Sequence, residues 1–186
     1  MANAVSALQG AAYNGYVGIR EIGPVGMITL RGVPGDLEAA VQASMGLDLP
    51  LPRRIGMAGA RSVGWMSPDE FLLVLPHAEV KNTLEALHNE LQGKHFLAVY
   101  VSDARAVFTL TGAGAREVLA KLCPVDLSPA AFQPGDLRRT RAAQVAAALW
   151  ISGVDEFTVV SFRSVAAYVF ALLKTSAAPG GEVGRF

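Results

Sequence analysis

The segment GWMSPDEFLLVLP, from Gly64 to Pro76, has a close counterpart near the C-terminus, LWISGVDEFTVVSF, from Leu149 to Phe162. Each segment contains a Trp, an apolar residue and a Ser, then a short turn with Asp-Glu-Phe, then an apolar run. Pro and Asp favour a turn, and an unbroken apolar run of this length predicts a buried strand. Each segment is therefore predicted to form a β-hairpin, and the repetition indicates an internal duplication.

The two hairpins occupy corresponding places in two similar runs of elements. Periodicity and turn residues predict the elements of the first half over 16–22, 25–32, 36–45, 54–58, 61–66, 71–75 and 80–91. The same signals predict those of the second half over 96–101, 107–111, 115–122, 138–142, 145–151, 157–162 and 164–174. Each half has the order β2αβ3α, and the phrase TLRG at 29–32 returns as TLTG at 109–112.

We therefore predict an α+β fold with mostly antiparallel sheets and pseudo-twofold symmetry. The duplicated β2αβ3α subdomains comprise residues 1–95 and 96–186, which we expect to pack into one compact body. Superposition of the halves should place Trp65 on Trp150 and Phe71 on Phe157. The predicted core residues, which lie in hairpins or apolar helical stripes, are Trp65, Phe71, Leu87, Leu119, Trp150 and Phe157. The Gly-rich C-terminal stretch, SAAPGGEVGRF, is expected to fray.

The composition restricts the class of protein. A chain of 186 residues with 52% hydrophobic and 17% charged residues is typical of a well-packed globular protein. The formal net charge is zero, which argues against binding to nucleic acid or to an anionic membrane. The single cysteine, Cys123, excludes an internal disulfide and indicates a reducing compartment. No apolar run is long enough to span a bilayer and no signal peptide is recognised, so we expect a cytoplasmic protein.

Candidate catalytic and metal-binding residues are few. His77, His88 and His95 lack cysteine or carboxylate partners at metal-ligand spacing. Cys123 has no nearby histidine to activate it, which favours a structural thiol over a nucleophile. In TGAGARE, from Thr111 to Glu117, a Glu stands where a dinucleotide-binding fingerprint requires a third Gly or Ala. We interpret this stretch as a tight strand-to-helix turn.

Two sets of charged residues remain. Asp69 and Asp155 lie at predicted hairpin tips, where turn chemistry explains them without an acid–base role. The basic residues concentrate at Arg138, Arg139 and Arg141. On a strand, Arg139 and Arg141 share one face and Arg138 points to the other. These arginines could form a solvated or salt-bridged sheet edge, or could contact an anion or a partner protein.

The stretch VFTLTGAGAREVLAKLCPVDLSPAAFQPGDLRRTRAAQVAAALWISGVDEFTVVSF, from Val107 to Phe162, resembles the gamma subunit of heterotetrameric sarcosine oxidase. The strand-Gly-helix stretch, the CPVDL phrase, the GDLRRTR phrase and the Trp-to-Asp-Glu-Phe hairpin occur in the same order. The first half, from GMITLRG to EFLLVLP, also fits that family, so the resemblance covers nearly the whole chain.

This family is similar to the T-protein aminomethyltransferase of glycine cleavage. The resemblance implies the folate-binding, aminomethyltransferase-like fold, in which two β2αβ3α subdomains exchange their first strands. It also implies a non-catalytic role in a complex that oxidises sarcosine to glycine, with release of peroxide and transfer of a one-carbon unit to tetrahydrofolate. FAD, FMN, NAD and tetrahydrofolate would then bind to other subunits and none to this chain. The partners would be larger, flavin-bearing alpha and beta subunits and a small delta subunit.

The sequence departs from the folate-dependent transferases at one point. Those enzymes carry an acidic residue on the central hairpin, whereas GMAGARSVGW and TRAAQVAAALW contain neither Asp nor Glu. A stand-alone folate-binding protein or aminomethyltransferase-like enzyme would need a carboxylate from elsewhere, such as Asp36, Asp103 or Asp126. A third hypothesis is a small-molecule-binding regulatory module with its ligand between the halves.

Overall fold

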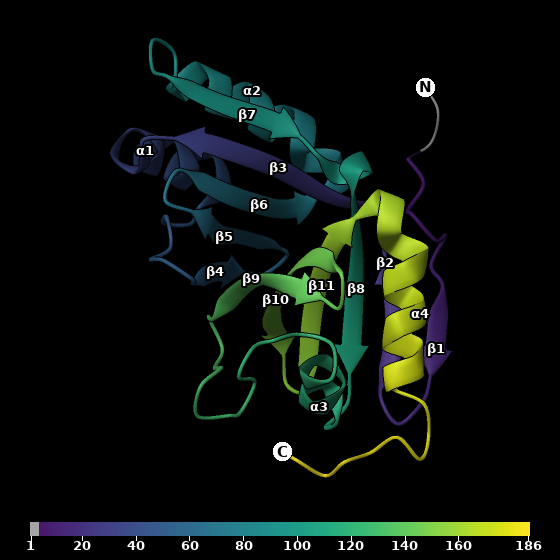
Figure 1. Cartoon of the computed structure of the whole chain (residues 1–186). Helices are drawn as coiled ribbons and strands as arrows, with labels where there is room; N and C mark the ends of the chain where they lie inside the picture. Colours follow the sequence, from purple (N-terminus) through teal and green to yellow (C-terminus); the bar gives the residue numbers. More distant parts are fainter. Residues whose placement is uncertain (1–3) are drawn as a thin grey trace. The chain divides into compact units, whose positions relative to one another are not determined.

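The computed structural model describes residues 4–186, which fold as two units, each built on its own sheet (Figure 1). Unit 1 contains the residues up to Gly23 together with Asp103–Phe186, and unit 2 contains Pro24–Ser102. All strand pairs are antiparallel, which confirms the predicted α+β fold with antiparallel sheets. The units do not coincide with the predicted halves 1–95 and 96–186, because one strand of each half pairs in the sheet of the other half.

Unit 1 is a six-stranded sheet in the order β1-β2-β8-β11-β10-β9, with helices on one face. Its strands are β1 (Ala12–Asn14), β2 (Gly18–Ile22), β8 (Arg105–Thr111), β9 (Leu137–Ala142), β10 (Val145–Gly153) and β11 (Glu156–Phe162). Its helices are α3 (Ala115–Ala120), the 3-10 turn η3 (Arg163–Val165) and α4 (Ala166–Ser176). The short strand β1 was not predicted from the sequence, because three residues carry too little periodicity.

Unit 2 is a five-stranded sheet in the order β4-β5-β6-β3-β7. Its strands are β3 (Val25–Gly32), β4 (Ile55–Ala58), β5 (Arg61–Ser67), β6 (Glu70–Pro76) and β7 (Phe96–Tyr100). Its helices are α1 (Pro34–Met45), the 3-10 turn η1 (His77–Glu79) and α2 (Val80–Glu90), and the 3-10 turn η2 (Ser102–Ala104) links the units. Helix α1 begins with Pro34, whose ring suits the first turn, and ends at Gly46, whose φ of 69° allows the left-handed cap.

The first strand of each half pairs in the sheet of the other half. Strand β2, from the first half, lies beside β8 with Ile19 opposite Leu110. Strand β7, from the second half, lies beside β3 with Ala98 opposite Leu30. The structure therefore has the strand exchange that the family resemblance implied, and each unit is completed by a strand from the other half of the sequence.

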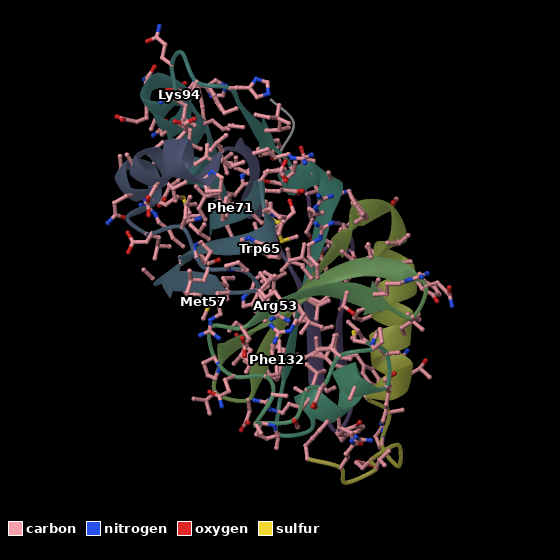
Figure 2. All side chains as sticks on the ribbon, turned by 60° about the vertical axis from the view of Figure 1, so that its left-hand side comes forward. Arg53, Met57, Trp65, Phe71, Lys94 and Phe132 are labelled. Atoms are coloured by element: carbon pink, nitrogen blue, oxygen red, sulfur yellow. The ribbon has the colours of Figure 1, made fainter. Side chains whose placement is uncertain are left out.

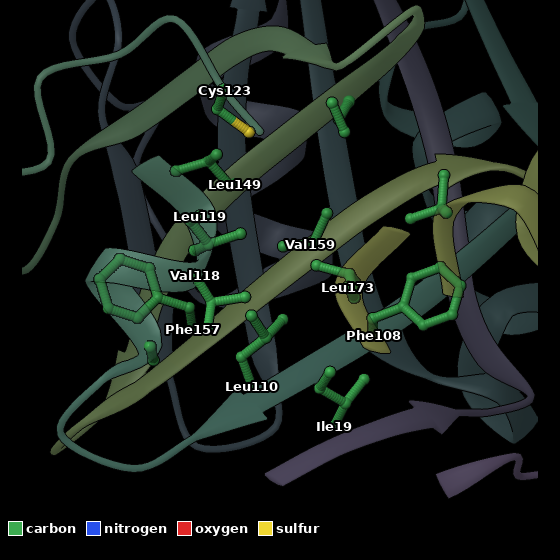
Figure 3. Close-up of a cluster of buried hydrophobic side chains, with 14 of the residues drawn as sticks. Ile19, Phe108, Leu110, Val118, Leu119, Cys123, Leu149, Phe157, Val159 and Leu173 are labelled. Atoms are coloured by element: carbon green, nitrogen blue, oxygen red, sulfur yellow. The ribbon is translucent and has the colours of Figure 1, made fainter. Parts of the chain in front are cut away.

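Each unit has its own hydrophobic core between its sheet and its helices. In unit 1, fully buried side chains from β2, β8, β10 and β11 meet those of α3 and α4 (Figure 3). In unit 2, Leu37 and Val41 of α1 and Leu87 of α2 pack on Ile28 and Leu73 of the sheet. The apolar stripes recognised in the sequence therefore face the two sheets.

The hairpin registers contradict the predicted superposition of the two tryptophans. Trp65 lies opposite Phe71 on β5–β6, but on β10–β11 the residue opposite Phe157 is Ile151. A β-bulge follows Trp65 in one hairpin and Ile151 in the other, so these two residues are equivalent and Trp150 is offset by one position. A one-residue shift moves a side chain to the opposite face of a sheet. The predicted match of Trp65 with Trp150 is therefore wrong, because pairing across the hairpin sets the register.

The six predicted core residues have different surroundings. Phe71, Leu87, Leu119 and Phe157 are buried between sheet and helices. Trp150 is also buried, but it lies on the face of its sheet that points away from α3 and α4. Trp65 packs beside Phe71 on the helix side of unit 2 and stays partly exposed (Figure 2). Its large ring is placed near the end of the hairpin, where the sheet and helices cover it only in part.

Candidate functional site

The predicted arginine cluster lies on β9, which forms one edge of the unit 1 sheet. Arg139 and Arg141 are exposed, whereas Arg138 is partly buried, as the alternation of a strand requires. Arg138 pairs with Asp136 at 3.6 Å, and its guanidinium lies 5.3 Å from the centre of the Phe132 ring. Arg141 donates to the backbone oxygen of Gln144 at 3.0 Å. The cluster is therefore a charged sheet edge with two outward-facing arginines.

The TGAGARE stretch forms the predicted turn from β8 into α3, and a nearby tyrosine explains one of its glycines. A side chain at Gly114 would place its Cβ 2.6 Å from the Tyr16 ring. Strand β8 has antiparallel neighbours on both sides, and α3 spans six residues, so the surroundings of a dinucleotide-binding βαβ unit are not present here. Gly114 is therefore explained by its packing against Tyr16.

Glu117 holds the C-terminal segment against α3. Its carboxylate accepts hydrogen bonds from the amides of Val183 at 2.6 Å, Gly184 at 2.7 Å and Arg185 at 3.3 Å. Lys121, one helical turn further on, lies 3.4 Å from the same carboxylate. The Val183 hydrogen bond and those that follow it outweigh the effect of burial and lower the pKa of Glu117 to about 2. These hydrogen bonds join residues 183–185 of the C-terminal stretch to α3.

Arg116, the neighbour of Glu117, holds the long loop that leads to β9. Its Nη1 donates to the carbonyl oxygens of Leu127 at 2.8 Å and Phe132 at 2.9 Å. Its guanidinium also lies 5.4 Å from the centre of the Phe157 ring. Arg116 and Glu117, which lie in the stretch that carries the family resemblance, therefore contact the chain's own loop and C-terminal segment.

The three histidines have different surroundings. His77 Nε2 is 2.8 Å from Tyr100 Oη, and His88 Nδ1 is 2.7 Å from the carbonyl oxygen of Leu84. His95 lines a shallow hollow beside β7. Among residues 4–186, the structure contains no group of three His, Cys, Asp or Glu side chains arranged to hold a metal ion.

Cys123 is buried in the unit 1 core, and burial raises the pKa of its thiol to about 11 (Figure 3). A thiol with a raised pKa carries little thiolate at neutral pH and is a poor nucleophile. The side chain therefore acts as an apolar packing group.

The carboxylates considered for a folate site are exposed or engaged locally. Asp36 pairs with Lys94 at 2.7 Å, and Asp126 accepts the amide of Ser128 at 2.9 Å in the loop after α3. Asp103 lies exposed in η2. Asp36 belongs to unit 2, and Asp103 and Asp126 belong to unit 1.

The aspartates of the hairpin tips have structural roles. Asp69 accepts a hydrogen bond from Ser67 and pairs with Arg31 at 2.8 Å, and both contacts lower the pKa of its carboxyl. Asp155 has a φ of 50°, a conformation that Asp tolerates well in tight turns. The Asp-Glu-Phe motif thus forms the predicted turns.

Sequence reasoning missed the role of Glu117. A Glu and a Lys separated by four positions on a helix indicate an ion pair, and this signal could have been read. The contacts of Glu117 with the backbone of residues 183–185 could not have been read from the sequence, because they join positions far apart in it.

Among residues 4–186, no helix has the length and apolar character needed to cross a membrane.

The chain is similar in sequence to known proteins over most of its length. Residues 32–179 match the sarcosine oxidase, gamma subunit family. The sarcosine oxidase subunit gamma of an Arthrobacter species is 34% identical over 149 residues, which cover 78% of this chain and 72% of that protein. The subunit gamma of Corynebacterium sp. (strain P-1) is 32% identical over 151 residues, with the same coverage of 78% and 72%.

The structure gives the same result. A chain of the heterotetrameric sarcosine oxidase from Corynebacterium sp. U-96 superposes with a TM-score of 0.80 at 30% identity, covering 87% of this chain and 83% of that one. The glycine cleavage system aminomethyltransferase T from Bartonella henselae superposes with a TM-score of 0.67 at 15% identity, over 89% of this chain and 47% of that one, which shows a shared fold. Sequence and structure agree that the chain belongs to the sarcosine oxidase gamma subunit family.

Proposed function

We propose that this chain is a non-catalytic subunit of a heterotetrameric sarcosine oxidase, where it has a structural role. The observation that carries the proposal is the match to the gamma subunit family over residues 32–179, together with the superposition on a chain of a heterotetrameric sarcosine oxidase. The complex would convert sarcosine to glycine and peroxide and pass a one-carbon unit to tetrahydrofolate.

Two charged residues and the cysteine of unit 1 support a structural role. Arg116 and Glu117 bind backbone groups of the chain itself, and Cys123 is buried with a raised pKa. Oxidation of an amine needs an electron acceptor that amino-acid side chains do not supply, so the reaction depends on a bound cofactor. We propose that FAD, FMN, NAD and tetrahydrofolate are bound by the other subunits. The single buried cysteine is consistent with a cytoplasmic location, which we also propose.

The partners in this proposal are the flavin-bearing alpha and beta subunits and a small delta subunit. A permanent subunit interface buries on the order of 2,000 Å² or more. The candidate contacts are the exposed Arg139 and Arg141, together with Arg138 on the opposite face of β9, because arginine is enriched at protein interfaces.

The proposal is tested by co-expressing the chain with the genes next to its own and measuring the mass of the intact assembly. We expect a flavin-containing assembly with four different chains. The isolated chain, supplied with FAD, FMN and sarcosine, should stay colourless after desalting and produce no peroxide. A yellow, peroxide-producing isolated chain would contradict a non-catalytic role.

A second pair of measurements separates the alternatives. Thermal shift of the isolated chain by tetrahydrofolate would favour a stand-alone folate-binding protein, and a shift by amino acids without a folate response would favour a regulatory module. Reversal of charge in the double variant Arg139→Glu and Arg141→Glu tests the arginine edge. Unchanged assembly of that variant would exclude the two exposed arginines from the interface.

A further inference from the structure

The four outer strands of the two sheets differ in how they are protected against pairing with another strand. In unit 1 the edges are β1, with three residues, and β9, with three arginines. In unit 2 the edges are β4, with four residues, and β7. Short length and charged side chains are common ways to block an edge. Strand β7 has the sequence FLAVY and contains no charged residue, Pro or Gly.

The outward backbone groups of β7 can be assigned from one hydrogen bond. Val101, directly after β7, donates its amide to the carbonyl oxygen of Met27 at 2.9 Å and so faces β3. In an antiparallel pair, successive residues point their N–H and C=O groups alternately toward the partner and away from it. The groups of Phe96, Ala98 and Tyr100 therefore point away from β3. Among residues 4–186, β3 is the only strand that pairs with β7.

The side chains of β7 form an apolar surface on one face of the sheet. Phe96 and Ala98 pack on the unit 2 core, whereas Leu97 and Val99 are 52% and 40% exposed. Exposed neighbouring apolar residues on the edge strand of a sheet indicate a binding surface. The strand thus offers both backbone hydrogen-bonding groups and an apolar face.

A hollow of about 660 Å³ lies beside the start of β7. It is lined mainly by apolar or backbone surface, including Val33, Pro34 and Leu97. The lining also includes His95 and the ion pair of Arg31 with Asp69 at 2.8 Å, and the nearby Lys94 is 2.7 Å from Asp36 on α1. An occupant of this surface therefore needs apolar side chains and no compensating charge.

We propose that β7 binds an extended, apolar and uncharged segment of a partner subunit, which adds to the unit 2 sheet as a further strand. Backbone hydrogen bonds to the outward groups of β7 would hold the segment, and its alternate side chains would cover Leu97 and Val99 and enter the hollow. The inference rests on the proposed function and names the surface involved. A different subunit is favoured over a second copy, because the chain superposes on a subunit of a heterotetramer.

The test is hydrogen exchange of single amides in the full chain, measured alone and in the co-expressed complex. The amides of Leu97 and Val99 face β3 and should be protected in both states. Those of Ala98 and Tyr100 face outward and should exchange rapidly in the isolated chain and slowly in the complex. Contact through side chains alone would leave the outward amides unprotected, so this alternating pattern is specific for an added strand.

Leu97→Lys provides a second readout that does not require loss of the fold. Leu97 is already half exposed, but it lies opposite Arg31 on β3, so an added strand would bury the new ammonium group beside another positive charge. We therefore expect the variant to reduce the amount of this chain in the purified complex at least about tenfold. Met57→Lys is the matched control, because Met57 is 42% exposed on β4, the opposite edge of the same sheet (Figure 2). It should assemble as the wild type does.

The outcomes separate this inference from the proposed function. If the wild-type chain joins no flavin-containing complex, the proposed function fails. If the complex forms while the outward amides exchange freely and Leu97→Lys assembles normally, the β7 inference alone fails. A dimer of the isolated chain that Leu97→Lys disrupts and Met57→Lys does not would make a second copy the occupant and overturn the proposal of a partner subunit.

Discussion

Ile19 and Ile28 lie close together in the sequence but belong to different sheets. Ile19, on β2, is 2% exposed and packs in the unit 1 core with Phe108 and Leu110 (Figure 3). Ile28, on β3, is completely buried in the unit 2 core. Replacing Ile19 by Ala should therefore weaken the unit that is formed mainly by the second half of the sequence.

The size of the effect follows from the burial of Ile19. The Ile19→Ala change removes three carbon atoms, worth about 2.4 kcal/mol at about 0.8 kcal/mol per buried methylene. If the neighbours do not move, a cavity of about 80 Å³ adds about 1.9 kcal/mol at about 24 cal/mol per Å³. The free energy of opening unit 1 should fall by about 2.4 to 4.3 kcal/mol. This range corresponds to a loss of hydrogen-exchange protection of about 50-fold to 1,000-fold, at about 1.4 kcal/mol per factor of ten.

Amide hydrogen exchange of the isolated chain measures this effect in each unit. In Ile19→Ala, the slowest amides of β8 and β11 should lose protection more than those of β3 and β6. The control Ile28→Ala applies the same chemical change to unit 2 and should give the reverse pattern. If Ile19→Ala instead weakened β3 and β6 and left β8 and β11 protected, β2 would belong to the unit of its sequence neighbours. The strand exchange would then be wrong.

Three further predictions concern single side chains. Truncation of Trp150 to Ala should lower the free energy of unfolding by about 3–5 kcal/mol, whereas the same change at the partly exposed Trp65 should have a smaller effect, measured by urea denaturation with fluorescence or circular dichroism. The pKa of Glu117 lies at about 2 in the folded chain, below its usual 4.5, so its stabilising contribution is complete above about pH 4.5 and is lost as the pH falls toward 2. The amide of Val183 should lose protection over that pH range, and Glu117→Ala should lose it at every pH. The pKa of Cys123 is about 11, so only about one thiol in a thousand is ionised at pH 8. Alkylation of Cys123 by iodoacetamide should therefore be much slower in the folded chain than in urea. Equal rates in the two conditions would show that the thiol is accessible.

Much of the fold followed from local patterns in the sequence. The order β2αβ3α in each half, both Asp-Glu-Phe hairpins and the apolar stripes of α1 and α2 depend on residues within a few positions of each other. Periodicity and turn chemistry were therefore sufficient to predict them. The arginines of β9 were placed on the correct faces for the same reason. The register of the two hairpins could not be predicted in this way, because it is set by pairing across the turn. Aligning Trp65 with Trp150 in the sequence ignored the pairing of Phe157 with Ile151 across the turn, and one position decided which face each tryptophan occupies.

The sequence by itself determined the class of fold, the repeated order of elements and the resemblance to a family, because each depends on short segments that occur in a fixed order. Only the tertiary structure decided that β2 and β7 join the sheets of opposite halves, that Glu117 binds the backbone of residues 183–185, and that β7 remains an uncharged outer strand. These features depend on which distant segments bury each other's apolar faces and satisfy each other's backbone groups. A strand with apolar residues on both faces fits next to many others, so the choice is made by the packing of the whole unit and not by the strand's own sequence.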